Sequence, residues 1–154
     1  MIYLDNAATT YPKPSSVYKS VMKAMKEYGA NPGRGSHAMA IEGARVIYET
    51  RELLAELFNL DDPMKAVFTF NATDSLNIAI KGILSTGDHV VTTEMEHNSV
   101  LRPIKELEKI GIENTIVKCA PDGTISLSDL ENAIKDNTKL IVTTHVSNLT
   151  GTIF

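Results

Sequence analysis

The segment from Val67 to Leu84, VFTFNATDSLNIAIKGIL, decides the fold of this chain. It begins with a short apolar run, breaks at the polar residues Asn71–Asp74, and continues with apolar residues at helical spacing. This order predicts a strand, a tight connection and a helix. A polar connection of this kind can be a simple turn, or it can hold an anion at the helix N-terminus.

The same alternation continues on both sides of this segment. Apolar residues at helical spacing predict helices at 15–28, 37–59, 74–84, 99–110 and 126–136. Short apolar runs between turn residues predict strands at 2–4, 66–70, 89–93, 113–118 and 139–145. Strands that alternate with helices indicate an α/β fold, with a largely parallel sheet whose faces are covered by helices.

Composition narrows the classes of function. The 154 residues are 43% hydrophobic and 22% charged, which is typical of one globular domain with a sizeable core. The net charge of −4, without a long basic run, argues against a nucleic-acid or membrane partner and favours small molecules or proteins. The first 14 residues lack the features of an export signal, and the lone Cys119 fits a reducing compartment as a structural residue. We expect a soluble, cytoplasmic protein.

Polar residues follow three of the predicted strands, which is where α/β folds bind their ligands. At the first, Thr73 and Asp74 lie where a helix begins, so that free N–H groups and the helix dipole suit a phosphate. The alternative is that Thr73 only caps its helix. Neither G-x-x-x-x-G-K-[ST] nor G-x-G-x-x-G occurs there, which argues against nucleoside-triphosphate and dinucleotide sites.

The second and third strand ends carry His97 and Asn148. His97 precedes a helix that Asn98 or Ser99 can cap, so its ring can stack on a planar cofactor or transfer a proton. It can equally be a capping or surface residue. Glu94 with His97 is a poor metal site, and no metal is predicted. Asn148 can donate a hydrogen bond to a ligand or stabilise a turn.

Together the three strand ends offer a phosphate seat, an imidazole that can stack and an amide donor. These three features match the needs of a phosphorylated aromatic cofactor. Pyridoxal 5′-phosphate fits this set best.

Five motifs carry a resemblance to a known family. They are YLDNAATT at 3–10, NPGRGSH at 31–37, ATDSLN at 72–77, EHNSV at 96–100 and HVSN at 145–148. Over essentially its whole length the chain resembles the cysteine desulfurase and selenocysteine lyase family, in the class V aminotransferase group of pyridoxal-phosphate enzymes. The resemblance implies the three-layer α/β large domain of these enzymes, incomplete in this chain. Residues 1–30 would be an N-terminal segment and helix, and 31–154 the first part of the cofactor-binding domain.

The resemblance also implies roles for individual residues. Ala72 and Thr73 would hold the cofactor phosphate, Thr73 with its hydroxyl as well as its backbone. His97 would stack on the pyridine ring and assist proton transfer. Asn148 would donate to the phenolic oxygen of the cofactor.

A further match lies at the predicted active-site entrance. Asn31, Arg34 and His37 belong to a loop that in the family lies close to the partner subunit of a homodimer. Two positions depart from the family pattern, with Asn71 where Gly or Thr is usual and Asp74 where Glu is usual. Asn tolerates left-handed geometry and Asp keeps a negative charge near the helix N-terminus, so we expect the turn to be preserved.

The family's Schiff-base lysine, nucleophilic loop cysteine, pyridine-pairing aspartate and substrate-binding arginine match no motif in residues 1–154. We therefore expect the N-terminal part of a longer enzyme. The parent would convert L-cysteine to L-alanine and an enzyme persulfide, with selenocysteine as the alternative substrate. A sulfur-acceptor protein, as in iron–sulfur cluster assembly, would be its partner. The fragment alone is expected to be inactive.

Two alternatives remain open at the level of sequence. One is a class V aminotransferase that acts on a small amino acid, which the presence or absence of the loop cysteine would distinguish. The other is a noncatalytic phosphate-binding or interaction domain that is complete at 154 residues. An open reading frame that ends at Phe154 would support the second alternative.

Overall fold

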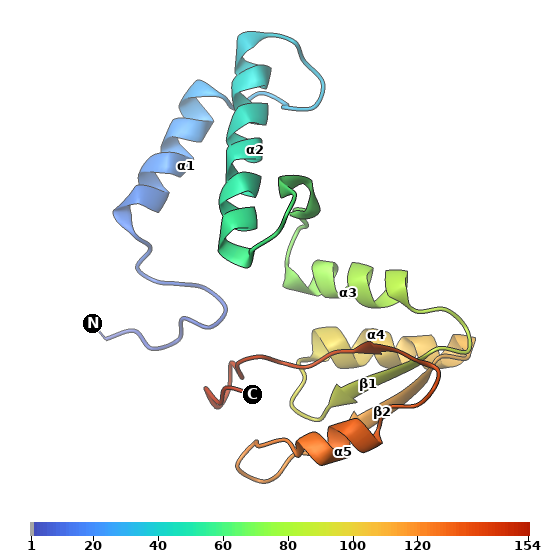
Figure 1. Cartoon of the computed structure of the whole chain (residues 1–154). Coiled ribbons are helices and arrows are strands. Elements are labelled where there is room, and N and C mark those ends of the chain that lie inside the picture. Colours follow the sequence, from blue (N-terminus) through green and yellow to red (C-terminus); the bar gives the residue numbers. More distant parts are fainter. Residues whose placement is uncertain (1) are drawn as a thin grey trace. The chain divides into compact units, whose positions relative to one another are not determined.

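The computed structural model describes residues 2–154, which form two compact units that meet in sequence between Phe68 and Thr69. The first unit is helical and contains α1 (Ser15–Glu27), α2 (Ala38–Phe58) and a 3₁₀ turn, η1 (Pro63–Lys65) (Figure 1). Helix α2 ends at Asn59, whose left-handed backbone (φ 52°) lets the Leu60 N–H bond back to the Ala55 carbonyl. No helix in residues 2–154 has the length and apolar character needed to cross a membrane.

The second unit is the α/β part of the chain. Its elements are α3 (Ala72–Ile83), β1 (His89–Thr93), α4 (Asn98–Leu107), η2 (Glu108–Ile110), β2 (Glu113–Val117), α5 (Leu127–Asn132) and β3 (Thr138–Ile141). The three strands form a parallel sheet in the order β2-β1-β3. The predicted α/β class with a parallel sheet is therefore confirmed.

The core lies between this sheet and the helices α3 and α4. Strand β1 is in the middle of the sheet, and all five of its residues are buried. Apolar side chains from both helices and from β1 make one buried cluster with Ile112, namely Ile80, Leu84, Val90, Val100, Ile104 and Leu107. In Figure 1, α5 lies on the opposite side of the strands from α4. Helices thus flank the sheet, as the alternating pattern predicts.

Two predicted strands do not form. Residues 2–4 and 66–70 have no strand assignment, and no strand pairs with either run within residues 2–154. A short apolar run takes up strand structure only where a neighbouring strand satisfies its backbone, so these two predictions were wrong. The strand predicted at 139–145 is also shorter, since β3 ends at Ile141.

A buried histidine joins all three strands at the start of β1. The His89 ring has no exposed surface, and its Nδ1 lies 2.8 Å from Thr138 Oγ1 and its Nε2 2.9 Å from Thr115 Oγ1. Thr138 Oγ1 accepts the Lys135 N–H, which leaves its own proton free to donate to Nδ1. This arrangement suits a neutral ring with its proton on Nε2. Burial, with the nearby Lys135 charge, lowers the pKa of His89, while Glu113 opposes the shift.

This burial predicts an acid-sensitive fold. Because the pKa of His89 is lower in the folded than in the unfolded chain, the unfolded chain takes up the extra proton as the pH falls below about 6.5. The free energy of unfolding should therefore be fully present above that pH and fall below it. Urea denaturation at pH 7.5 and pH 5 measures the difference. The His89→Gln variant, which keeps a donor and an acceptor, should lose less stability between the two pH values. An equal loss in both proteins would contradict this assignment.

Candidate cofactor site

The first part of the site is the N-terminus of α3. Asn71 is its N-cap, and the Asn71 Oδ1 accepts the Asp74 N–H at 2.9 Å. Ala72 and Thr73 are the first two helical residues, so their N–H groups have no acceptor within the helix. Thr73 is exposed, and its hydroxyl makes no hydrogen bond with any of residues 2–154. Two backbone donors and one hydroxyl are therefore available at the positive end of the helix dipole.

Helix α3 begins earlier than the sequence predicts. Asn71 caps α3, whereas Thr73, the alternative cap, lies two residues inside the helix. Thr69 further stabilises the turn before α3, because its hydroxyl donates to the Asn71 carbonyl and lies close to the Ser75 hydroxyl. Asn71 has an extended backbone (φ −169°), so the left-handed geometry considered for it is not used.

Removal of the cap has a predictable cost. Asn71→Ala should lower the free energy of unfolding by about 0.5–2 kcal/mol, because the Asp74 N–H loses its acceptor. Asn71→Ser should retain most of the stability, since a hydroxyl also caps well. Urea denaturation of the three proteins measures this. A loss in the serine variant as large as in the alanine variant would show that the cap is not the cause.

His97 begins helix α4 and caps it. Its Nδ1 accepts the Ser99 N–H at 3.1 Å and lies 2.7 Å from the Ser99 hydroxyl. The sequence predicts Asn98 or Ser99 as the cap, with His97 itself as an alternative, and in the structure the cap is His97. Since Nδ1 acts as an acceptor, the neutral ring carries its proton on Nε2. The side chain is exposed, so Nε2 and the ring faces remain available to a ligand.

Thr73 and His97 line one cavity of about 270 Å³ between the N-terminal turns of α3 and α4. Asn77 of α3 and Arg102 of α4 line it too. Within residues 2–154, no carboxylate lies within ion-pair distance of the Arg102 guanidinium. Glu106, on the same wall, is paired with Lys81 at 2.6 Å, and this bond lowers the pKa of Glu106. The cavity therefore combines helix N-termini with a positive side chain, an environment that favours an anion.

Asn148 lies at the tip of a tight turn after β3. The Ser147 N–H donates to the Thr152 carbonyl, and the Ser147 hydroxyl accepts the N–H groups of Leu149 and Thr150. Ser147 therefore stabilises the turn, and the Asn148 amide is exposed without a hydrogen bond to any of residues 2–154. Asn148 does not line the cavity of Thr73 and His97. Its role toward a ligand stays a prediction.

Asn31, Arg34 and His37 belong to the first unit, and their predicted entrance role also stays a prediction. Asn31 Oδ1 accepts the Gly33 N–H at 2.9 Å, which fixes the loop before α2. His37 is the N-cap of α2. Arg34 is exposed. A Cβ at Gly35 would lie only 2.9 Å from the His37 ring, so a larger residue there would displace that ring.

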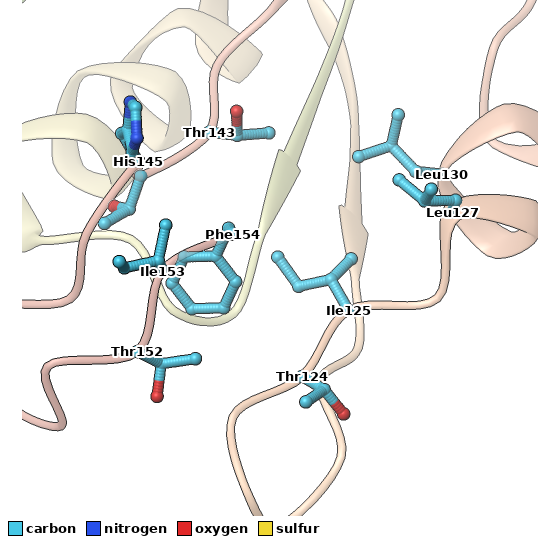
Figure 2. Close-up of a pocket in the computed structure, with 10 residues that line it drawn as sticks. Thr124, Ile125, Leu127, Leu130, Thr143, His145, Thr152, Ile153 and Phe154 are labelled. Atoms are coloured by element: carbon cyan, nitrogen blue, oxygen red, sulfur yellow. The ribbon is translucent and has the colours of Figure 1, made fainter.

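A larger hollow of about 640 Å³ lies elsewhere in the second unit (Figure 2). Apolar side chains from the α5 region and from the C-terminal segment line it, among them Ile125, Leu130, Ile153 and Phe154. None of the predicted cofactor residues takes part in its lining. Size alone therefore does not identify the site, and the chemistry of the smaller cavity fits a phosphorylated ligand better.

The fold and the sequence assign the chain to a known class. A family model of the class-V aminotransferases matches residues 2–154, and the chain belongs to this family. Enzymes of this family use pyridoxal phosphate.

Individual relatives are cysteine desulfurases. The chain is 37% identical over 158 residues to the cysteine desulfurase IscS of Stutzerimonas stutzeri, covering 99% of this chain and 39% of that protein. The apo structure of a cysteine desulfurase from Thermococcus onnurineus NA1 matches with a TM-score of 0.87 and 32% identity, over 99% of this chain and 38% of that chain. A structure described as SspA in complex with cysteine matches with a TM-score of 0.85 and 32% identity, over 97% of this chain and 43% of that chain. The chain thus spans about two fifths of the length of the relatives that it matches.

Proposed function

We propose that this chain forms the N-terminal, phosphate-binding part of a pyridoxal-phosphate-dependent cysteine desulfurase. One observation carries the proposal: Thr73 and His97, from different motifs of the chain, line the same cavity. The identity to cysteine desulfurases supports the choice of reaction within the family. The substrate would be L-cysteine and the products L-alanine and an enzyme persulfide, in a homodimeric, cytoplasmic parent protein.

The residues at the start of α3 would bind the phosphate. The N–H groups of Ala72 and Thr73 are free to donate to phosphate oxygens, and the exposed Thr73 hydroxyl adds a third donor. Hydrogen bonds to a charged acceptor are stronger than neutral ones. The Arg102 guanidinium on the cavity wall adds positive charge, and the Glu106 carboxylate on the same wall is paired with Lys81.

His97 would contact the ring of the cofactor. Its Nδ1 is held by Ser99, which fixes the ring plane and leaves Nε2 as the atom that can give up or receive a proton. The exposed Asn148 amide would donate to the phenolic oxygen. Pyridoxal phosphate, when bound, supplies the electron sink for bond cleavage at the substrate's α-carbon.

We also propose that residues 1–154 alone do not turn over cysteine. None of the lysines of the chain lies in a motif that matches the family's cofactor-attaching lysine. The N–H groups and side chains around α3 offer only noncovalent contacts to the phosphate. Cofactor binding by this chain alone would therefore be weak and would depend on the phosphate group.

The product of the complete gene provides the test. Purified with pyridoxal phosphate and given L-cysteine, it should release alanine and, with a thiol reductant, sulfide in equal amounts. Formation of a keto acid instead of alanine would favour the alternative of an aminotransferase on a small amino acid. A product that neither binds pyridoxal phosphate nor consumes cysteine would contradict the proposal and favour a noncatalytic phosphate-binding domain.

A further inference from the structure

Glu96 is a buried acid that no cation neutralises. Only 7% of its surface is exposed, and no Lys, Arg or His side chain within residues 2–154 forms an ion pair with it. Its carboxylate accepts three hydrogen bonds instead. Oε1 accepts from the Thr93 hydroxyl at 2.9 Å and the Thr144 N–H at 2.7 Å, and Oε2 accepts from the Thr144 hydroxyl at 2.8 Å.

A buried carboxylate without a cation lowers the stability of the fold. Removal of a carboxylate from water is unfavourable, and hydrogen bonds from neutral donors replace only part of the lost hydration. If stability alone mattered, an apolar residue at this position would be more favourable. Two of the three hydrogen bonds fix the N–H and the hydroxyl of the distant Thr144, which points to a gain in geometry.

The hydrogen bonds of Glu96 hold the chain after β3, beyond the residues that pair with β1. Up to Val142 the segment after β3 is held by β1 itself, through the Val142 N–H to the Val91 carbonyl and the Thr92 hydroxyl to the Val142 carbonyl. Strand β1 then ends at Thr93. At Thr144, two residues after Val142, the backbone N–H and the hydroxyl donate to the Glu96 carboxylate and not to a neighbouring strand.

The two ends of this connection adjoin the proposed site. Glu96 immediately precedes His97, and Thr144 lies four residues before Asn148. We propose that Glu96 is a positioning residue, which fixes the turn that carries Asn148 relative to His97 by holding Thr144. This inference rests on the proposed function for its consequence in cofactor binding, but the connection itself is a property of this chain.

The side chain of Gln provides a sharp comparison. In Glu96→Gln the remaining oxygen can still accept from Thr93 and from the Thr144 N–H, and the new NH₂ can donate to the Thr144 hydroxyl. The geometry can therefore survive without the charge. Glu96→Ala removes all three bonds. Glu94→Ala is the matched control, because Glu94 lies in the same loop but binds the Cys119 N–H on the β2 side.

Two measurements on the complete gene product test the proposal. Hydrogen exchange, followed by mass spectrometry of peptides covering 142–150, should accelerate about tenfold or more in Glu96→Ala, as expected for loss of hydrogen bonds to a charged group. Peptides covering 89–93 should not change. The dissociation constant for pyridoxal phosphate should rise about tenfold in the same variant. Glu96→Gln should stay close to wild type in both measurements, and so should Glu94→Ala.

Three results would overturn the proposal: unchanged exchange at 142–150 in Glu96→Ala, the same acceleration in Glu94→Ala, or no rescue by Gln. If Glu96→Ala does not fold, Thr144→Val decides instead, because it removes one donor to Glu96 and should accelerate exchange at 145–150 while Thr144→Ser does not. If wild-type protein fails to bind pyridoxal phosphate, the proposed function is lost, whereas the exchange measurement still decides the role of Glu96.

Discussion

His97→Ala is expected to lower kcat/KM for L-cysteine in the complete gene product by about 10²- to 10⁴-fold, the range typical of a lost general acid–base group. His97 lines the cavity with Thr73, and its Nδ1 is fixed by Ser99, so Nε2 is the ring atom available for proton transfer. The alanine variant removes both the transferable proton and the ring face. Steady-state rates of alanine formation measure the effect.

Phe at the same position separates the two contributions of His97. His97→Phe keeps a flat ring that can stack but has no nitrogen, so it should bind pyridoxal phosphate more tightly than His97→Ala and turn over as slowly. Both variants lose the α4 cap, which makes them a matched pair for stability. Near wild-type turnover in either variant would exclude His97 from proton transfer.

Ile104→Ala is expected to lower the free energy of unfolding of the second unit by about 2–5 kcal/mol, the range for truncation of a large core residue. Ile104 is 1% exposed and belongs to the cluster that joins α4 to α3 and β1. Its loss leaves a cavity in the layer that supports both N-terminal turns of the site. Urea denaturation, followed by the amide NMR resonances of residues 69–154, measures the change in the second unit, because all five tyrosines lie in the first unit and optical signals of tertiary structure would report on that unit.

Leu127→Ala is the control for this core substitution. Leu127 begins α5 and is 76% exposed, so its truncation should change the free energy of unfolding by no more than about 0.5 kcal/mol. Equal losses in the two variants would contradict the location of the core between the sheet and α3 with α4.

The sequence predicts the fold well where local pattern and tertiary packing agree. Strand β1 begins and ends at the predicted residues, 89 and 93, and α2 matches to within one residue at each end. The sequence-based prediction fails where the pairing of strands determines the structure. The run at 66–70 is apolar enough for a strand, but strand structure also requires a neighbour, which periodicity does not reveal.

For the site, the motifs predict which residues to examine, and the structure adds how they are held. Thr73 and His97 line one cavity, and their joint action on a cofactor stays a prediction. Asn71 as the cap of α3 has a local signal, since Asn is a favoured N-cap three residues before Asp74. Glu96 belongs to the motif EHNSV, but nothing local in the sequence shows its partner, and Arg102 lies outside the five motifs. Their contacts, to Thr144 and to the cavity wall, depend on long-range packing.

The central claim, that the start of α3 holds a phosphate, is tested most directly by comparing two ligands in one variant. Thr73→Val keeps the size of the side chain and removes the hydroxyl. In the complete gene product, the dissociation constant for pyridoxal phosphate should rise about tenfold or more, as for a lost hydrogen bond to a charged group, while that for pyridoxal should not change. Equal effects on both ligands, or no effect on pyridoxal phosphate, would contradict the claim.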